Sequence, residues 1–159
     1  MLKTNAEWQA LADHIAREIM GWVKWAELTE GEQKAVRKSH IWRHSPYDGY
    51  WWQRNLAILH IAVGISLWQP HVNIAQAILV LDRMSGWRKG AMRNWFYQIR
   101  SYPQVDGHLY NVYLRKCVPR EGSQDWRVLK HSADADNRER AICLAIEQCL
   151  DAQKVEQGA

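Results

Sequence analysis

Basic and aromatic side chains alternate in two stretches of this sequence, and together they could bind an anion that carries flat rings. Guanidinium groups donate paired hydrogen bonds to phosphate, and tryptophan and tyrosine rings stack on nucleobases. In one stretch the candidate ligand-binding residues are Arg88, Lys89, Arg93, Trp95, Tyr97, Arg100, Tyr113 and Arg115. In the other, the candidate interface residues are Trp42, Arg43, Tyr50, Trp51, Trp52 and Arg54.

Both sets also have an ordinary structural explanation. A sheet covered by helices needs aromatic side chains inside, and lysines and arginines are common on the solvated positions of its strands. Trp, Tyr and Arg are also the residues that dominate interfaces between proteins. Composition therefore leaves three alternatives open for these residues: a nucleotide-like ligand, a protein partner, and the fold's own core and surface.

The distribution of charge favours an anionic partner. The chain has 21 Lys and Arg against 17 Asp and Glu, a formal net charge of +4, and ten tryptophans against one phenylalanine. Residues 83–131 hold ten bases and three acids, whereas residues 132–159 hold three bases and six acids. We therefore expect an electrically polar protein whose basic side attracts anions.

Two histidines, His40 and His44, have a spacing that places two imidazoles on one helical face. Asp48 is the only carboxylate near them in the sequence, and the neighbouring Lys38 and Arg43 would repel a cation. We therefore expect solvated histidines and no metal site.

No motif in the sequence points to catalysis. The three cysteines show no CxxC spacing, which argues against a disulfide framework, and the sequence contains no nucleophile elbow, P-loop or dinucleotide-binding motif. We expect a binding protein rather than an enzyme, with no cofactor.

Capping signals and apolar periodicity predict the elements that would position these residues. The pairs Thr4 with Glu7 and Asp136 with Glu139 are capping boxes, and Asn73 is a further cap. Together with apolar residues at spacings of three and four, they predict helices at about 5–20, 73–84 and 136–151. Alternation of period two predicts strands near 95–102, 109–116 and 126–130. The expected fold class is α+β, a sandwich in which a small three-stranded antiparallel sheet packs with three or more helices.

Residues 25–67 give weaker signals. Thr29 with Glu32 predicts a short exposed helix, and residues 45–49 predict a turn. The run 56–67 is apolar on all sides, so periodicity does not separate a buried helix from a buried strand.

Three short pieces of the sequence resemble one family, the phage ABA sandwich domain. They are Met20-Gly21-Trp22, the stretch from Trp68 to Ala77 followed by Asp82-Arg83-Met84, and Ala141-Ile142-Cys143-Leu144-Ala145. His71 and Asn73 depart from the family's pattern, in which Ser or Thr and then Asp are usual. The resemblance implies a gene carried by a phage or prophage, and helices on a small antiparallel sheet. It implies no catalytic residue.

We therefore expect a single domain over residues 1–153, with an extended aromatic insertion at about 25–67 and a frayed tail at 154–159. The expected function is that of a phage or prophage accessory protein acting in counter-defence, by sequestering a small anionic nucleotide-like ligand of the host. The alternative is a protein inhibitor of a host defence complex, of the anti-CRISPR or anti-restriction type. The N-terminus is polar and no apolar run is long enough to span a bilayer, so we expect the cytoplasm of the bacterial host and no membrane partner. Exposed aromatic residues would also allow a homo-oligomer.

Overall fold

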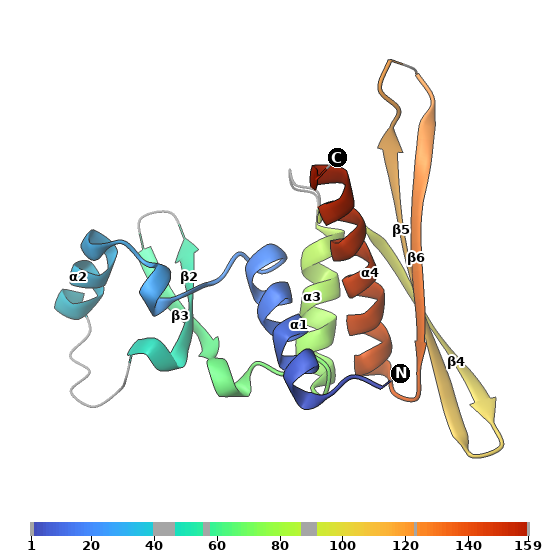
Figure 1. The fold of residues 1–159 in the computed structure, drawn as a ribbon, viewed down its shortest axis with the longest axis horizontal. Coiled ribbons are helices and arrows are strands. Elements are labelled where there is room, and N and C mark those ends of the chain that lie inside the picture. The colour runs from blue at the N-terminus through green and yellow to red at the C-terminus, as the bar shows by residue number, and fades with distance from the viewer. Residues whose placement is uncertain (1, 40–46, 56–57, 87–91, 123, 159) are drawn as a thin grey trace.

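The computed structural model describes residues 2–39, 47–55, 58–86, 92–122 and 124–158. Within these ranges the α-helices are α1 (Asn5–Glu18), α2 (Glu30–Ser39), α3 (Ile74–Ser85) and α4 (Arg138–Gly158). The first sheet contains β1 (Val23–Lys24), β2 (Tyr50–Asn55) and β3 (Ile58–Gly64), and the second contains β4 (Phe96–Gln104), β5 (Gly107–Pro119) and β6 (Trp126–Ala135). Short 3-10 turns lie at Trp25–Glu27, Tyr47–Gly49 and Ile65–Leu67. The molecule is elongated, with α1, α3 and α4 between the two sheets (Figure 1).

The expected fold class is wrong, because the chain contains two separate antiparallel sheets and not one. The apolar run that periodicity left ambiguous forms β3, which pairs with β2 through partners such as Trp51 with Val63 and Trp52 with Ile61. Ile and Val are β-branched, and such side chains favour a strand over a helix. Residues 25–67 thus contribute a second layer of sheet, with β1 pairing along the other side of β2.

Helices and turns cover the first sheet on both faces. Neighbouring residues of a strand point to opposite faces, so Trp51 packs into the main core beside α1. Trp52 faces the other way and packs with Leu28 and Val36 in a small separate cluster. Both indole rings are fully buried as a result.

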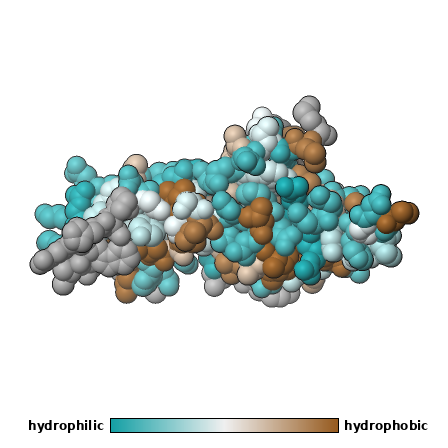
Figure 2. All heavy atoms as spheres, turned by 90° about the horizontal axis from the view of Figure 1, so that it is seen from below, coloured by the Kyte–Doolittle hydropathy of each residue, from teal (hydrophilic) through white to brown (hydrophobic). Residues whose placement is uncertain are grey.

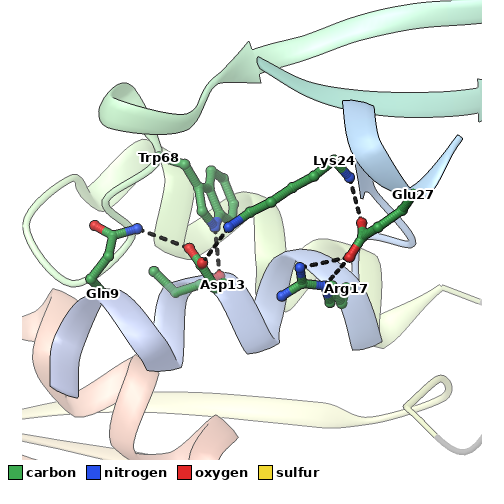
Figure 3. Close-up of polar contacts among 7 residues, drawn as sticks. Gln9, Asp13, Arg17, Lys24, Glu27 and Trp68 are labelled. Carbon is green, nitrogen blue, oxygen red and sulfur yellow. Dashed lines mark hydrogen bonds and ion pairs between the residues drawn. The ribbon is translucent and has the colours of Figure 1, made fainter. Parts of the chain in front are cut away.

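Polar contacts fasten the first sheet to α1 (Figure 3). Lys24 pairs with Asp13 at 2.9 Å, and Arg17 pairs with Glu27 at 2.7 Å. The indole N–H of Trp68 donates to the Ala12 carbonyl oxygen at 2.8 Å, in a buried position. A buried hydrogen bond of this kind satisfies two groups that would be costly to leave unpaired.

The second sheet is the predicted meander, and its strands and the three predicted helices begin within about two residues of their expected starts, whereas β6 and α4 end five and seven residues later than expected. The Thr4–Glu7 capping box is present, whereas α4 begins two residues later than expected, at Arg138, and Asn137 rather than Asp136 accepts a hydrogen bond from the Arg140 N–H. The helix α4 continues through the expected tail to Gly158.

Helices α3 and α4 cover one face of the second sheet. Val112 and Leu114 of β5 are fully buried against them, among Leu81, Ile142 and Ile146 of the main core. No helix in the described ranges is long and apolar enough to cross a membrane.

Candidate functional site

The face of the second sheet that points away from α3 and α4 is covered by no described element (Figure 1). We call it the outer face. Because partners in an antiparallel ladder point the same way, the register assigns every side chain on these strands to one face or the other. The outer-face residues are Phe96, Gln98, Arg100, Tyr102, Gln104, Leu109, Asn111, Tyr113, Arg115, Cys117, Pro119, Trp126, Val128, Lys130, Ser132 and Asp134.

Large hydrophobic side chains are exposed on the outer face. Trp126 is 64% exposed and Phe96 is 61% exposed, and Tyr102 and Val128 are exposed as well. The solvated side of an antiparallel sheet is ordinarily polar, so this set departs from a plain surface. Figure 2 shows hydrophobic and hydrophilic side chains interspersed on another side of the molecule, seen from below. Exposed aromatic residues gathered on one face mark an interaction surface.

The centre of the outer face is basic. Arg115 lies between Phe96 and Lys130 in one row across the three strands. Among the described residues, neither Arg115 nor Lys130 has an ion pair or a hydrogen bond from its side chain. Arg100 donates to the Gln98 side-chain oxygen at 2.9 Å. The one acid of this face, Asp134, accepts a hydrogen bond from Asn111 at 2.7 Å.

The structure divides the predicted ligand-binding residues between the two faces. Arg100, Tyr113 and Arg115 lie on the outer face, whereas Trp95 and Tyr97 point toward the helices. Trp95 is 4% exposed and belongs to the main core. The Tyr97 hydroxyl donates to Asp82 at 3.3 Å, and burial together with that carboxylate raises the pKa of the phenol.

Arg93 is engaged within the fold and does not lie on the outer face. Arg93 donates hydrogen bonds to the Arg83 and Ile19 carbonyl oxygens, so its guanidinium group holds the end of α3 and the end of α1 together. Arg88 and Lys89 lie outside the described residues. The described members of the predicted set therefore divide between the two faces, and those on the outer face form the candidate site.

The described members of the second predicted set have partners within the fold. Trp51 is fully buried, and the cations that accompany its ring are Arg17, at 5.3 Å, and Lys24, at 5.1 Å. Trp52 is also buried, and its N–H donates to the Tyr47 carbonyl oxygen at 3.0 Å. Neither ring is therefore available as a surface anchor.

Tyr50 and Arg54 also have partners within the fold. Tyr50 is half-buried against the small cluster. Arg54 forms two hydrogen bonds with Glu32, at 2.8 and 2.9 Å, which tie β2 to the start of α2. Trp42 and Arg43 lie outside the described residues, as do His40 and His44.

Four aromatic or basic residues of the outer face were missing from the candidate set: Phe96, Tyr102, Trp126 and Lys130. The signal that could have found them is the alternation itself. Residues two apart on a strand share a face, so Phe96 and Tyr102 share the face of Arg100, and Trp126 shares the face of Lys130.

A groove of about 500 Å³ lies along the edge of β5 beyond the start of β4, and residues of both faces of the sheet line it. It arises because β4 begins at Phe96, opposite Arg115, whereas β5 continues four residues further, to Pro119. The lining residues are Ser85, Asn94, Trp95, Phe96, Lys116, Cys117, Val118, Pro119 and Trp126.

No protein-family model matches the chain, and neither a curated protein nor a solved structure matches it. The resemblance to the phage ABA sandwich domain stays a prediction. Within the described ranges, His, Cys, Asp and Glu side chains form no group of three that could hold a metal ion.

Proposed function

We propose that the outer face binds an anionic ligand that carries flat rings, and that the ligand is a single-stranded nucleic acid. The observation that carries the proposal is the row formed by Phe96, Arg115 and Lys130, with Tyr113 on the same face. Exposed aromatic rings stack on bases without regard to sequence, and unpaired cations contact the phosphates between them.

The openness of this face favours a nucleic-acid chain over a small nucleotide as the ligand. Sites for small molecules are concave and surround most of the ligand. Arg100 is the direct partner of Asn111, and Asn111 lies four residues before Arg115 on β5. The row of Arg100 and the row of Arg115 are therefore about 14 Å apart along the strand. One phosphate does not span that distance, whereas a chain of nucleotides that runs along the strands meets both rows.

In the cell, we propose that this binding serves counter-defence. The small nucleotide-like ligand expected from the sequence and the strand proposed here share the same chemistry of rings and phosphates. A protein encoded by a phage or prophage that captures such a molecule in the bacterial cytoplasm would keep it from a host defence component.

A second candidate function is an inhibitor that docks on a host protein complex. The observation that favours it is the apolar end of the outer face, where Trp126 and Val128 are exposed beside Pro119. Exposed tryptophans are typical anchors of protein interfaces. In that case Trp126→Ala would abolish inhibition, and the loss of Arg115 would chiefly slow association in a salt-dependent way.

The test is a titration of a fluorescent oligothymidylate of twelve nucleotides with the full-length protein, followed by anisotropy. We expect binding that weakens steeply with salt, and a weaker complex for Arg115→Ala, because one charge-assisted contact is lost. Lys34→Ala is the matched control, because Lys34 is an exposed cation on α2, at the other end of the molecule.

The same titration separates the alternatives. Unlabelled cyclic dinucleotides and ADP-ribose, added as competitors, test the small-messenger interpretation. If no oligonucleotide binds at about 50 mM salt, the proposed function is wrong, and a cyclic dinucleotide or ADP-ribose that then binds alone supports the small messenger instead.

A further inference from the structure

We infer that the groove at the end of β5 is a pocket for one nucleobase of the bound strand. This inference rests on the proposed function, since it assigns a place to one unit of that ligand. The groove is lined by Trp95, Phe96, Cys117 and Trp126, among others, and its volume is about 500 Å³. That volume falls in the range of ordinary ligand pockets, and it exceeds what one planar ring needs.

The lining has the chemistry of a base site. Phe96 and Trp126 are both largely exposed, so their ring faces are available for stacking. Polar groups at the edge of a ring would meet Asn94 and Lys116, which also line the groove. The Lys116 ammonium group lies 5.9 Å from the centre of the Trp95 ring, so a cation stands close to the aromatic part of the lining.

The backbone at the groove is unusual in one respect. Asn94 has a φ of 62°, in the left-handed region, and it is the one residue other than glycine with positive φ in the described part of the chain. Asn adopts this conformation more readily than most residues other than glycine. The turn at Asn94 directs the chain toward Trp95 and the start of β4 at Phe96.

Charge complementarity selects the occupant. Cys117 follows Arg115 by two residues on β5, about 7 Å along the same face, and Phe96 is the direct partner of Arg115. A nucleotide whose base enters the groove therefore has its phosphate within reach of Arg115 and Lys130. A neutral aromatic peptide side chain would use the groove but leave these two cations without a partner.

The experiment compares oligothymidylate with an abasic oligonucleotide of equal length, which keeps the phosphates and lacks the bases. For the oligothymidylate we expect Trp126→Ala and Phe96→Ala to weaken binding by roughly 5- to 150-fold, the range for one base–aromatic stack. For the abasic strand we expect little change, because its contacts are made by Arg115 and Lys130. Val105→Ala is the control, because Val105 is a fully exposed hydrophobic residue at the far end of the same sheet.

A second readout uses the wild-type protein and requires no variant. Cys117 lines the groove and is exposed, so its thiol reports occupancy. We expect oligothymidylate to slow its reaction with a thiol reagent and the abasic strand to leave the reaction rate unchanged.

Each outcome decides one claim. If oligothymidylate does not bind the wild-type protein, the proposed function fails and this inference fails with it. If it binds, but the two variants bind equally well and Cys117 stays reactive, the groove is not a base pocket and the proposed function stands. If the free protein is a dimer that Trp126→Ala dissociates, a second copy of this chain covers the groove and the inference is wrong.

Discussion

Arg115 and Lys130 are direct partners across the ladder of β5 and β6, so two cations lie side by side on the outer face. In the described ranges no carboxylate pairs with either of them. Like charges directly opposite each other in a sheet destabilise it. The fold therefore carries a small cost at the position where we place the ligand's phosphate.

The variant Lys130→Gln should separate stability from binding. We expect it to raise the free energy of unfolding by about 0.2 to 1 kcal/mol, because the repulsion with Arg115 is removed. We expect the same change to weaken binding of the oligonucleotide. Urea denaturation and anisotropy measure the two effects, with Lys34→Gln as the control. A variant that is less stable, or that binds as well as wild type, contradicts this assignment.

The stack of His71 on Trp8 makes the free energy of unfolding depend on pH. His71 lies on Trp8 with the ring centres 5.2 Å apart and the planes 7° apart, and burial, with the charge of Arg140, lowers the pKa of the imidazole. The folded state thus binds the proton less readily than the unfolded chain does. This contribution to stability is complete above the unfolded pKa of about 6.5, and it is lost as the pH falls below that value.

The variant His71→Phe keeps the stack and removes the titrating group. Between about pH 7.5 and 5.5, we expect the wild type to lose more stability than this variant, by less than about 1 kcal/mol because the imidazole is partly exposed. Urea denaturation at both values of pH measures the difference. His60→Gln serves as the control, since His60 is exposed on β3. Equal pH dependence in His71→Phe and wild type would show that the stack does not titrate.

The pair of Arg54 and Glu32 should be structural. The hydrogen bonds from Arg54, and then that from the Thr29 backbone, lower the pKa of Glu32 to about 2. Its contribution is therefore present above the ordinary carboxyl pKa and lost as the pH falls toward 2. Because the pair is largely exposed, we expect Arg54→Ala to cost only about 0.5 to 1 kcal/mol. Thermal denaturation measures this loss, and oligonucleotide affinity should not change; a loss of affinity would place Arg54 in the binding site.

The three thiols should differ in reactivity. Cys117 is exposed, whereas burial raises the pKa of Cys149 to about 12 and raises that of Cys143 as well. We expect one equivalent of thiol to react with a thiol reagent in the native protein, and three after denaturation without reductant. The native protein of Cys117→Ser should show no fast reaction. Fast reaction of two or more thiols in the native wild type would contradict the burial of the last helix's cysteines.

Local signals predicted the helices and the meander, and long-range contacts explain what they missed. The Thr4–Glu7 and Thr29–Glu32 boxes each need only four consecutive residues, and both are present. The second sheet depends on β2 and β3 pairing with each other, which an apolar run without clear periodicity does not reveal.

The candidate site could be predicted only in part, for a related reason. Alternation already places Tyr97 and Arg100 on opposite faces of β4, but it does not say which face the helices cover. Burial of Val112 and Leu114 decides that, and it leaves Arg100 and Arg115 outside. The use of Trp51 as a core residue, under the cations of Arg17 and Lys24, likewise depends on α1 packing against β2.

The most direct test of the outer face as a nucleic-acid site is the salt dependence of oligothymidylate binding, measured for the wild type and for the double variant Arg115→Ala/Lys130→Ala. Each phosphate contact on a single strand contributes about 0.7 to the slope of log affinity against log salt concentration. If both cations contact phosphates, the slope should fall by about 1.4 in the double variant, with weaker binding at low salt. An unchanged slope and affinity, in a variant that folds like the wild type, would contradict the proposal.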